Sequence, residues 1–384
     1  MSAMVVNLIP LGELATIVMG QAPSSNDCNF EGRGTPFVKV GEFAASRPVI
    51  REWTTNPLKM ARSTDVLVCV VGATCGKLNL GEDCAIGRSV AAIRPEPLKL
   101  DQFYLHYFLM TLIDRLRAGS VGAAQTVISK EMIQSIPFPW RDLSEQRRIV
   151  AILDEAFEGI ATAKANAEKN LQNAREVFEN FVQSMFTLRG PGWTERTLED
   201  VCEIAAKLVD PREPEYLDLP HIGAGNIESK SGAVIDVRTA REEQLISGKF
   251  LFDERAVLYS KIRPYLMKVV RPTFSGVCSA DIYPLIPKSG GIDRDYLYHL
   301  LLTPSFTAYA IKGSARAGMP KVNRDHLFAY QSWLPPIQEQ ARLAARLDAV
   351  VDETQRLAEI FGAKLSALND LKKSLLHQAF TGAL

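Results

Sequence analysis

The sequence has few features that would place the protein in a membrane or hold it together with disulfide bonds. Among its 384 residues, no apolar run approaches the roughly 20 residues that cross a bilayer. The N-terminus has no basic segment ahead of an apolar one, unlike a secretory signal peptide. Six cysteines are scattered without Cys-x-x-Cys pairs, and five histidines form no metal-binding set. We therefore expect a cytoplasmic protein with reduced thiols and no metal site.

The sequence also has no excess of charge of one sign. Lys and Arg total 44, as do Asp and Glu, so the formal net charge is zero. Residues 1–141 hold 14 basic against 12 acidic side chains, and residues 193–335 hold 18 against 18. Any affinity for nucleic acid must therefore come from locally clustered cations, or from a partner that contacts the phosphates.

Motifs for catalysis are missing as well. Gly72-Ala-Thr-Cys-Gly-Lys77 looks like a phosphate-binding loop, but that motif needs four residues between its glycines and a Ser or Thr after the lysine. This sequence has three residues there and Leu78 after the lysine. There is no glycine fingerprint for a dinucleotide, no nuclease-like pair of carboxylates, and Asn56-Pro57-Leu58 departs from the Asn-Pro-Pro-Tyr methyltransferase tetrad. We expect no catalytic residues in this chain.

The C-terminal half of the sequence repeats the N-terminal half. Leu11-Gly-Glu-Leu corresponds to Leu198-Glu-Asp-Val, 187 residues later, and Pro36-Phe-Val-Lys-Val-Gly to Pro220-His-Ile-Gly-Ala-Gly, 184 residues later. Over residues 119–187 the offset is constant at 194 residues. A changing offset indicates length changes in loops, and a constant offset indicates a segment held to fixed geometry.

The constant-offset segments, residues 142–190 and 336–384, are predicted to be two long antiparallel helices. Apolar residues recur at spacings near three and four. They are Ile149, Leu153, Ala156, Ile160, Ala163, Ala167, Ala174, Val177 and Phe181, then Leu343, Leu347, Val350, Leu357, Phe361, Leu365, Leu368 and Leu375. Asp142 followed by Glu145 has the form of a capping box. Two ordinary helices inside a larger core are the alternative, but the length, well above the usual ~11–12 residues, favours a coiled-coil pair.

Residues 1–141 and 191–335 are predicted to be mixed α/β domains. Short runs rich in β-branched and aromatic residues alternate with Gly, Pro and Asn. One helix is predicted in each domain, at residues 102–117 and 294–312. We therefore expect two mixed α+β domains joined by the two long helices, with an internal pseudo-twofold repeat.

Both long helices begin with similar sequences, Ile136-Pro-Phe-Pro-Trp-Arg-Asp-Leu-Ser-Glu-Gln-Arg-Arg-Ile149 and Trp333-Leu-Pro-Pro-Ile-Gln-Glu-Gln-Ala-Arg-Leu343. Two variable domains, each followed by such a Glu-Gln helix start, resemble the specificity subunits of type I restriction–modification enzymes. The helix ends, Phe181-Val-Gln-Ser-Met-Phe-Thr and Leu376-His-Gln-Ala-Phe-Thr-Gly, are similar to that family too. The resemblance covers essentially the whole chain. Trp140-Arg141 is a departure, because the second start has Pro-Pro there.

The resemblance implies a non-catalytic targeting subunit. Each α/β domain is then a target recognition domain that reads one half of a bipartite DNA site, and the helix pair is a spacer that sets the unread gap. Two modification subunits would bind S-adenosylmethionine and methylate adenine. Restriction subunits would use ATP and Mg to translocate and cut double-stranded DNA. This chain would hold no cofactor itself.

Two alternatives stay open. The first is the recognition part of a fused methyltransferase–endonuclease, which predicts methyltransferase motifs in the same polypeptide. The second is a coiled-coil adaptor that does not bind DNA, which predicts no sequence-specific retention on DNA.

Candidate DNA contacts are polar and cationic residues in predicted loops and at strand ends. They are Lys39, Lys77, Arg88, Gln125, Thr126 and Lys130 in the first domain, and Lys261, Arg263, Lys268, Arg316, Lys321, Asn323 and Arg324 in the second. Arginine can pair with guanine, Gln and Asn with adenine, and lysine with phosphate. The alternative role of each is a solvated surface side chain.

Partner docking is predicted at the helix starts. The candidates are Glu145, Gln146, Arg147, Arg148, Glu339, Gln340 and Arg342. Their alternative role is helix capping and surface ion pairing.

Overall fold

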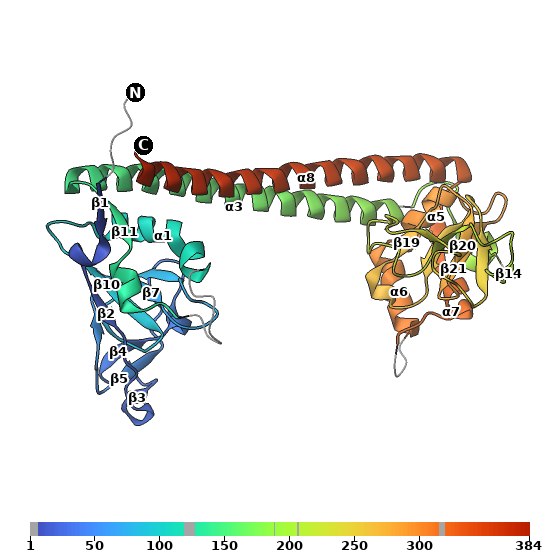
Figure 1. Cartoon of the computed structure of the whole chain (residues 1–384). Coiled ribbons are helices and arrows are strands. Elements are labelled where there is room, and N and C mark those ends of the chain that lie inside the picture. The colour runs from blue at the N-terminus through green and yellow to red at the C-terminus, as the bar shows by residue number, and fades with distance from the viewer. Residues whose placement is uncertain (1–6, 119–126, 188, 206, 315–318) are drawn as a thin grey trace. The chain divides into compact units, whose positions relative to one another are not determined.

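The computed structural model describes residues 7–118, 127–187, 189–205, 207–314 and 319–384 (Figure 1). The chain forms two units, residues 1–168 with 362–384 (unit 1) and residues 169–361 (unit 2). Each unit contains one α/β domain and parts of two 45-residue helices, α3 (Leu143–Thr187) and α8 (Ile337–Thr381). The predicted fold class is thereby confirmed. Among the described helices, none is long and apolar enough to span a membrane.

The described residues of unit 1 form three sheets. The first sheet pairs β1 (Asn7–Pro10) with β11 (Pro137–Trp140). The second has four strands, in spatial order β2 (Ala15–Met19), β10 (Val90–Pro95), β7 (Val66–Cys69) and β8 (Leu78–Leu80). The third has five strands, in spatial order β3 (Cys28–Asn29), β5 (Glu52–Thr54), β4 (Thr35–Val38), β9 (Cys84–Ile86) and β6 (Met60–Ala61). The helices of its domain are α1 (Gln102–Ala118) and α2 (Lys130–Gln134).

The described residues of unit 2 form three corresponding sheets. The first pairs β12 (Thr194–Thr197) with β22 (Gln331–Leu334). The second has four strands, in spatial order β13 (Cys202–Ile204), β21 (Ile282–Pro287), β18 (Val257–Ser260) and β19 (Val269–Val270). The third has five strands, in spatial order β14 (Leu208–Val209), β17 (Lys249–Phe252), β20 (Gly276–Cys278), β15 (Pro220–Ile222) and β16 (Arg238–Thr239). The helices of its domain are α4 (Leu198–Val201), α5 (Arg294–Leu301), α6 (Pro304–Ser314) and α7 (Arg324–Phe328).

The two domains share their strand pairing. Each five-stranded sheet contains a parallel pair, β4 with β9 and β15 with β20, inside otherwise antiparallel neighbours. The fifth strand is where they differ, because β3 extends the sheet beside β5 whereas β14 extends it beside β17. The duplication seen in the sequence is therefore a duplication of the fold, with variation at the sheet edge.

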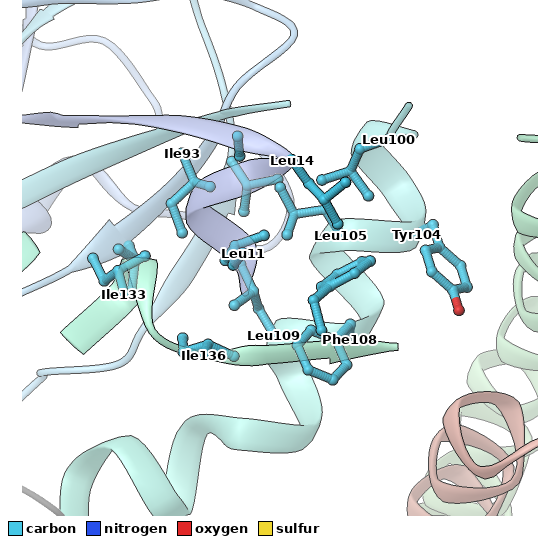
Figure 2. Close-up of a cluster of buried hydrophobic side chains, with 14 of the residues drawn as sticks. Leu11, Leu14, Ile93, Leu100, Tyr104, Leu105, Phe108, Leu109, Ile133 and Ile136 are labelled. Carbon is cyan, nitrogen blue, oxygen red and sulfur yellow. The ribbon is translucent and has the colours of Figure 1, made fainter. Parts of the chain in front are cut away.

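The main core of unit 1 joins its domain to the long helices. Figure 2 shows Leu11 and Leu14 of the short turn before β2, with Ile93 of β10, facing Leu105, Leu109 and other residues of α1. Ile149 and Leu153 of α3 belong to the same cluster, as does Phe380 of α8. The corresponding cluster in unit 2 includes Leu343 and Ala344 of α8, and Phe186 of α3 packs against it. Each α/β domain thus shares a hydrophobic core with the long helices and is not joined to them by a flexible linker alone.

Within each unit, α3 and α8 run antiparallel. In unit 1, Lys164 bonds Asn369, and the ammonium of Lys372 lies 4.6 Å from the ring centroid of Phe157. In unit 2, Arg346 lies over the ring of Phe181. The predicted apolar face is wrong at Val177, which is 66% exposed, because the neighbouring Phe178 is half-buried in its place.

A second sequence-based prediction also needs correction. The helix expected at residues 294–312 is two helices, α5 and α6, separated at Leu302 and Thr303. Pro304 has no N–H for an α-helical bond and so opens a new helix. The Thr303 hydroxyl accepts from the amide of Phe306, as a capping residue does.

One buried glutamine fixes each long helix to its domain. The side-chain oxygen of Gln146 accepts from the amide of Asp101, and its amide group donates to the carbonyls of Lys99 and Arg141, all at 2.7–2.8 Å. Gln340 repeats this contact with the amide of Asp293 (2.8 Å). The two glutamines are 0% and 2% exposed, so the prediction that they dock a partner is wrong: their hydrogen-bonding groups are used inside the chain.

We predict that Gln340→Ala lowers the free energy of unfolding of unit 2 by about 2 kcal/mol, because it leaves the partly buried backbone amide of Asp293 without its acceptor. Hydrogen exchange at the Asp293 amide should become faster. Gln338→Ala is the matched control, since Gln338 is exposed in the same turn of α8, and it should change stability by less than about 0.5 kcal/mol. Equal effects of the two substitutions would contradict the contact.

Candidate nucleic-acid interface

One turn shares several backbone hydrogen bonds between the two units. It is the β7–β8 turn (residues 70–77) in unit 1 and the β18–β19 turn (residues 261–268) in unit 2. The amide of Cys69 donates to the carbonyl of Lys77 (2.8 Å), and the amide of Ser260 donates to that of Lys268 (3.0 Å). Because the first turn joins two antiparallel strands, it does not lead into a helix as a phosphate-binding loop does, which agrees with the sequence analysis.

The two turns use different residues for the same backbone conformation. Gly72 and Gly76 have φ values of 90° and 86°, and the residues at the same positions in unit 2, Arg263 and Met267, both have φ of 50°. Left-handed backbone suits glycine and costs other residues about 1–2 kcal/mol each. Unit 2 therefore carries strain in a turn that unit 1 forms without it.

A second segment lies against each turn at an equivalent position. Val71 bridges Val127, and Ile262 bridges Lys321. The amide of Ile128 donates to Val70, as that of Val322 donates to Lys261. These segments lead into α2 and α7, whose first turns are capped by Ser129 and Asn323. The side-chain oxygen of Asn323 is thus already bonded to the amide of His326 (2.7 Å).

The predicted contacts of unit 2 gather around this paired structure. The ammonium of Lys261 lies 4.9 Å from the ring centroid of Tyr283, and Lys321 forms an ion pair with Asp281 at 3.6 Å. Burial, and then repulsion from Lys321, lowers the pKa of Lys261. Arg263 is exposed on the same turn. Tyr265, half-exposed beside it, was missed by the sequence analysis, although a Pro-Tyr pair in a basic turn was a usable signal.

Two predicted lysines have internal roles. Lys77 donates to the carbonyl of Phe43 (2.8 Å), and Lys268 donates to that of Ala224 (2.6 Å). Each bond ties its turn to the chain beyond the parallel strand, β4 or β15. Contact of these lysines with DNA stays a prediction.

The other candidates are more dispersed. Lys39 pairs with the carboxylate of Glu52, while Arg88 and Lys130 are exposed. Arg324 lies over the ring of Phe328, with its guanidinium 5.4 Å from the centroid. Gln125, Thr126 and Arg316 lie outside the described residues.

The charged residues of the helix starts also repeat. Glu145 bonds Arg148 at 2.7 Å, and Glu339 bonds Arg342 at 2.8 Å. The Asp142 carboxylate accepts from the amide of Glu145, so one half of the predicted capping box is present, while the Glu145 side chain turns to Arg148. These residues and the exposed Arg147 remain available to a partner, because surface ion pairs contribute little to stability.

None of the six cysteines forms a disulfide bond in the part of the chain that the structure describes. Five are buried and Cys28 is partly exposed. Burial raises the pKa of Cys84, Cys202 and Cys278 to about 12.

This architecture is shared with known proteins. The chain is 26% identical over 413 aligned positions to the specificity subunit of the type I restriction enzyme EcoDI from Escherichia coli, covering 98% of this chain and 88% of that protein. It is 30% identical over 168 residues to the putative MjaX specificity subunit of Methanocaldococcus jannaschii, covering 43% and 39%.

Solved structures agree on the fold. The HsdS subunit from Thermoanaerobacter tengcongensis superposes with a TM-score of 0.66 at 18% identity, over 98% of this chain and 97% of that one. A chain from a type I R-M system, solved for its complex assembly and conformational transition, gives a TM-score of 0.79 at 17% identity over 98% of both chains.

These likenesses define a class of duplicated α/β proteins built on paired long helices. A sequence profile of the type I restriction modification DNA specificity domain matches residues 6–172 and again residues 191–361. The chain therefore belongs to the type I restriction–modification DNA specificity family.

We predict that Gly72→Ala lowers the free energy of unfolding of unit 1 by about 1–2 kcal/mol, through its backbone conformation alone, because the space around an added methyl group is open among the described residues. Gly41→Ala is the matched control. Its surroundings are equally open, and its φ lies outside the left-handed region. Denaturant titration of both variants measures the difference, and a Gly72→Ala variant as stable as the control would show that the turn does not demand left-handed backbone.

Proposed function

We propose that this chain is the DNA-recognition subunit of a type I restriction–modification complex, with each α/β domain reading one half of a bipartite site. The observation that carries the proposal is that both halves match the DNA specificity domain separately and present the same paired turn with different side chains. One fold repeated with different surface chemistry suits a reader of two different sequences.

The distribution of charge supports this role. Although the chain is neutral, Lys261, Arg263 and Lys321 lie on one turn and its bridged neighbour, so positive charge is local rather than general. Local cations attract phosphate, and Arg, Asn and Gln can bond base edges. A neutral reader would also depend on partner subunits for part of its phosphate contact.

The long helices suit a spacer. A continuous helix of 45 residues measures about 68 Å at 1.5 Å per residue. Two readers must face the same duplex, whose repeat of roughly 34–36 Å limits the spacings that allow it. A stiff helix pair would hold such a spacing, which a flexible linker would not.

The proposed division of labour assigns chemistry to partners. Adenine methylation with S-adenosylmethionine, and ATP-dependent translocation and cutting with Mg, would belong to modification and restriction subunits. The exposed charged residues of the two helix starts, Arg147, Arg148 and Arg342 with their glutamates, are the proposed docking positions.

Co-expression of this chain with its modification subunit, in a host without its own adenine methylation, should produce a split methylated motif: two short specified sequences separated by a fixed unread gap. Sequencing that detects methylated adenine measures it. The modification subunit alone is the control and should leave the motif unmethylated. An active modification subunit whose methylation is unsplit, or independent of this chain, would refute the proposal.

A further inference from the structure

Three cationic residues of unit 2 lie on the β18–β19 turn and the segment bridged to it, and the equivalent positions of unit 1 hold uncharged residues. The pairs are Lys261 with Val70, Arg263 with Gly72, and Lys321 with Val127. The equivalence comes from backbone bonding rather than from sequence similarity, because the two bridges and the amide bonds beside them are repeated. We call Lys261, Arg263 and Lys321 the cationic triad.

The triad holds an excess of positive charge. Lys261 and Lys321 lie close enough to repel one another, which contributes to the lowered pKa of Lys261. Asp281 pairs with Lys321 and offsets one charge. In unit 1 the position of Asp281 is taken by Ser89, and the neighbouring Arg88 is an exposed cation. The two turns with their bridged segments therefore differ in charge even after their neighbours are included.

The backbone of Arg263 is held by hydrogen bonds, while its guanidinium makes no bond to any described residue. Its amide donates to the carbonyl of Pro320 and its carbonyl accepts from the amide of Leu266, both at 2.9 Å. Its side chain is exposed, and no described residue bonds the guanidinium. A left-handed arginine is unfavourable where glycine would fit, and such strain is typical of positions kept for function.

We propose that the cationic triad binds the DNA phosphates beside the half-site read by unit 2, and that unit 1 binds its half-site with fewer phosphate contacts. This inference rests on the proposed function. Phosphate contacts position a protein on DNA without reading bases, and they supply the salt-dependent part of affinity. Unit 2 is therefore the half that anchors the complex on the duplex.

The test replaces triad residues with those that unit 1 has at the same positions. Arg263→Gly and Lys321→Val, singly and together, are assembled with the modification subunit and titrated with two duplexes, one containing the methylated motif and one lacking it. Between 50 and 200 mM salt, the slope of log affinity against log salt should become less steep by about one for each substitution. Affinity for the two duplexes should fall by similar factors, and the methylated motif should stay the same.

Met267→Gly is the matched control. It changes the other left-handed residue of the same turn to the glycine of unit 1 but removes no charge. It should leave the salt slope unchanged. Because glycine suits both positions, neither Arg263→Gly nor Met267→Gly should lower the thermal midpoint of the chain, so a loss of affinity is not a loss of folding.

Each result decides the matter. An unchanged salt slope in the double variant overturns the inference, and so does a loss confined to the motif-containing duplex or a motif relaxed at one base, which would make these residues base readers. In those cases the split motif of the wild-type complex would still uphold the proposed function. A wild-type complex without a split motif would overturn both.

Discussion

In each half of this protein, a buried glutamine side chain ties the long helix to its domain. Gln146 and Gln340 each accept from the backbone of the aspartate that caps the domain helix, α1 or α5, and donate to carbonyls at the start of the long helix. An amide can do both at once because it carries a donor and an acceptor on one rigid plane. Burial makes the contact directional, since an unmatched group there would be costly. The long helix therefore leaves its domain in a fixed direction.

A second polar contact between each long helix and its domain lies eight residues further along the helix. Asp154 accepts from the hydroxyl of Tyr107. Asp348, at the equivalent position, accepts from His299 Nε2 (2.8 Å) and from Arg271. Burial lowers the pKa of His299 in spite of the carboxylate, which favours a neutral ring that donates a hydrogen bond to Asp348. Different side chains thus perform the same attachment in the two halves.

Much of this organisation could be predicted from the sequence, because duplication left a register to measure. The constant 194-residue offset predicted the long helices. It also identified Asp154 and Asp348, and Gln146 and Gln340, as equivalent positions of the two sequence repeats. Pattern alone could not assign the glutamines to the interior, because a polar residue beside exposed arginines is typical of a surface. The division between α5 and α6 was missed since apolar spacing continues across Pro304. The five-stranded sheets were missed because most of their strands have only two or three residues, too few to show a periodicity.

The turns show why site residues are harder to predict than fold. Gly72 and Arg263 have nothing in common as residue types, and only the shared hydrogen bonds identify them as the same position.

The buried thiols have a practical consequence for labelling the protein. Burial raises the pKa of Cys84, Cys202 and Cys278 to about 12, so these thiols are almost entirely protonated at neutral pH, and all five buried sulfur atoms are shielded from reagents. Once Cys28 is replaced, a cysteine introduced on either turn would be the most reactive in the chain, so a fluorophore could be attached there without first removing the native buried ones.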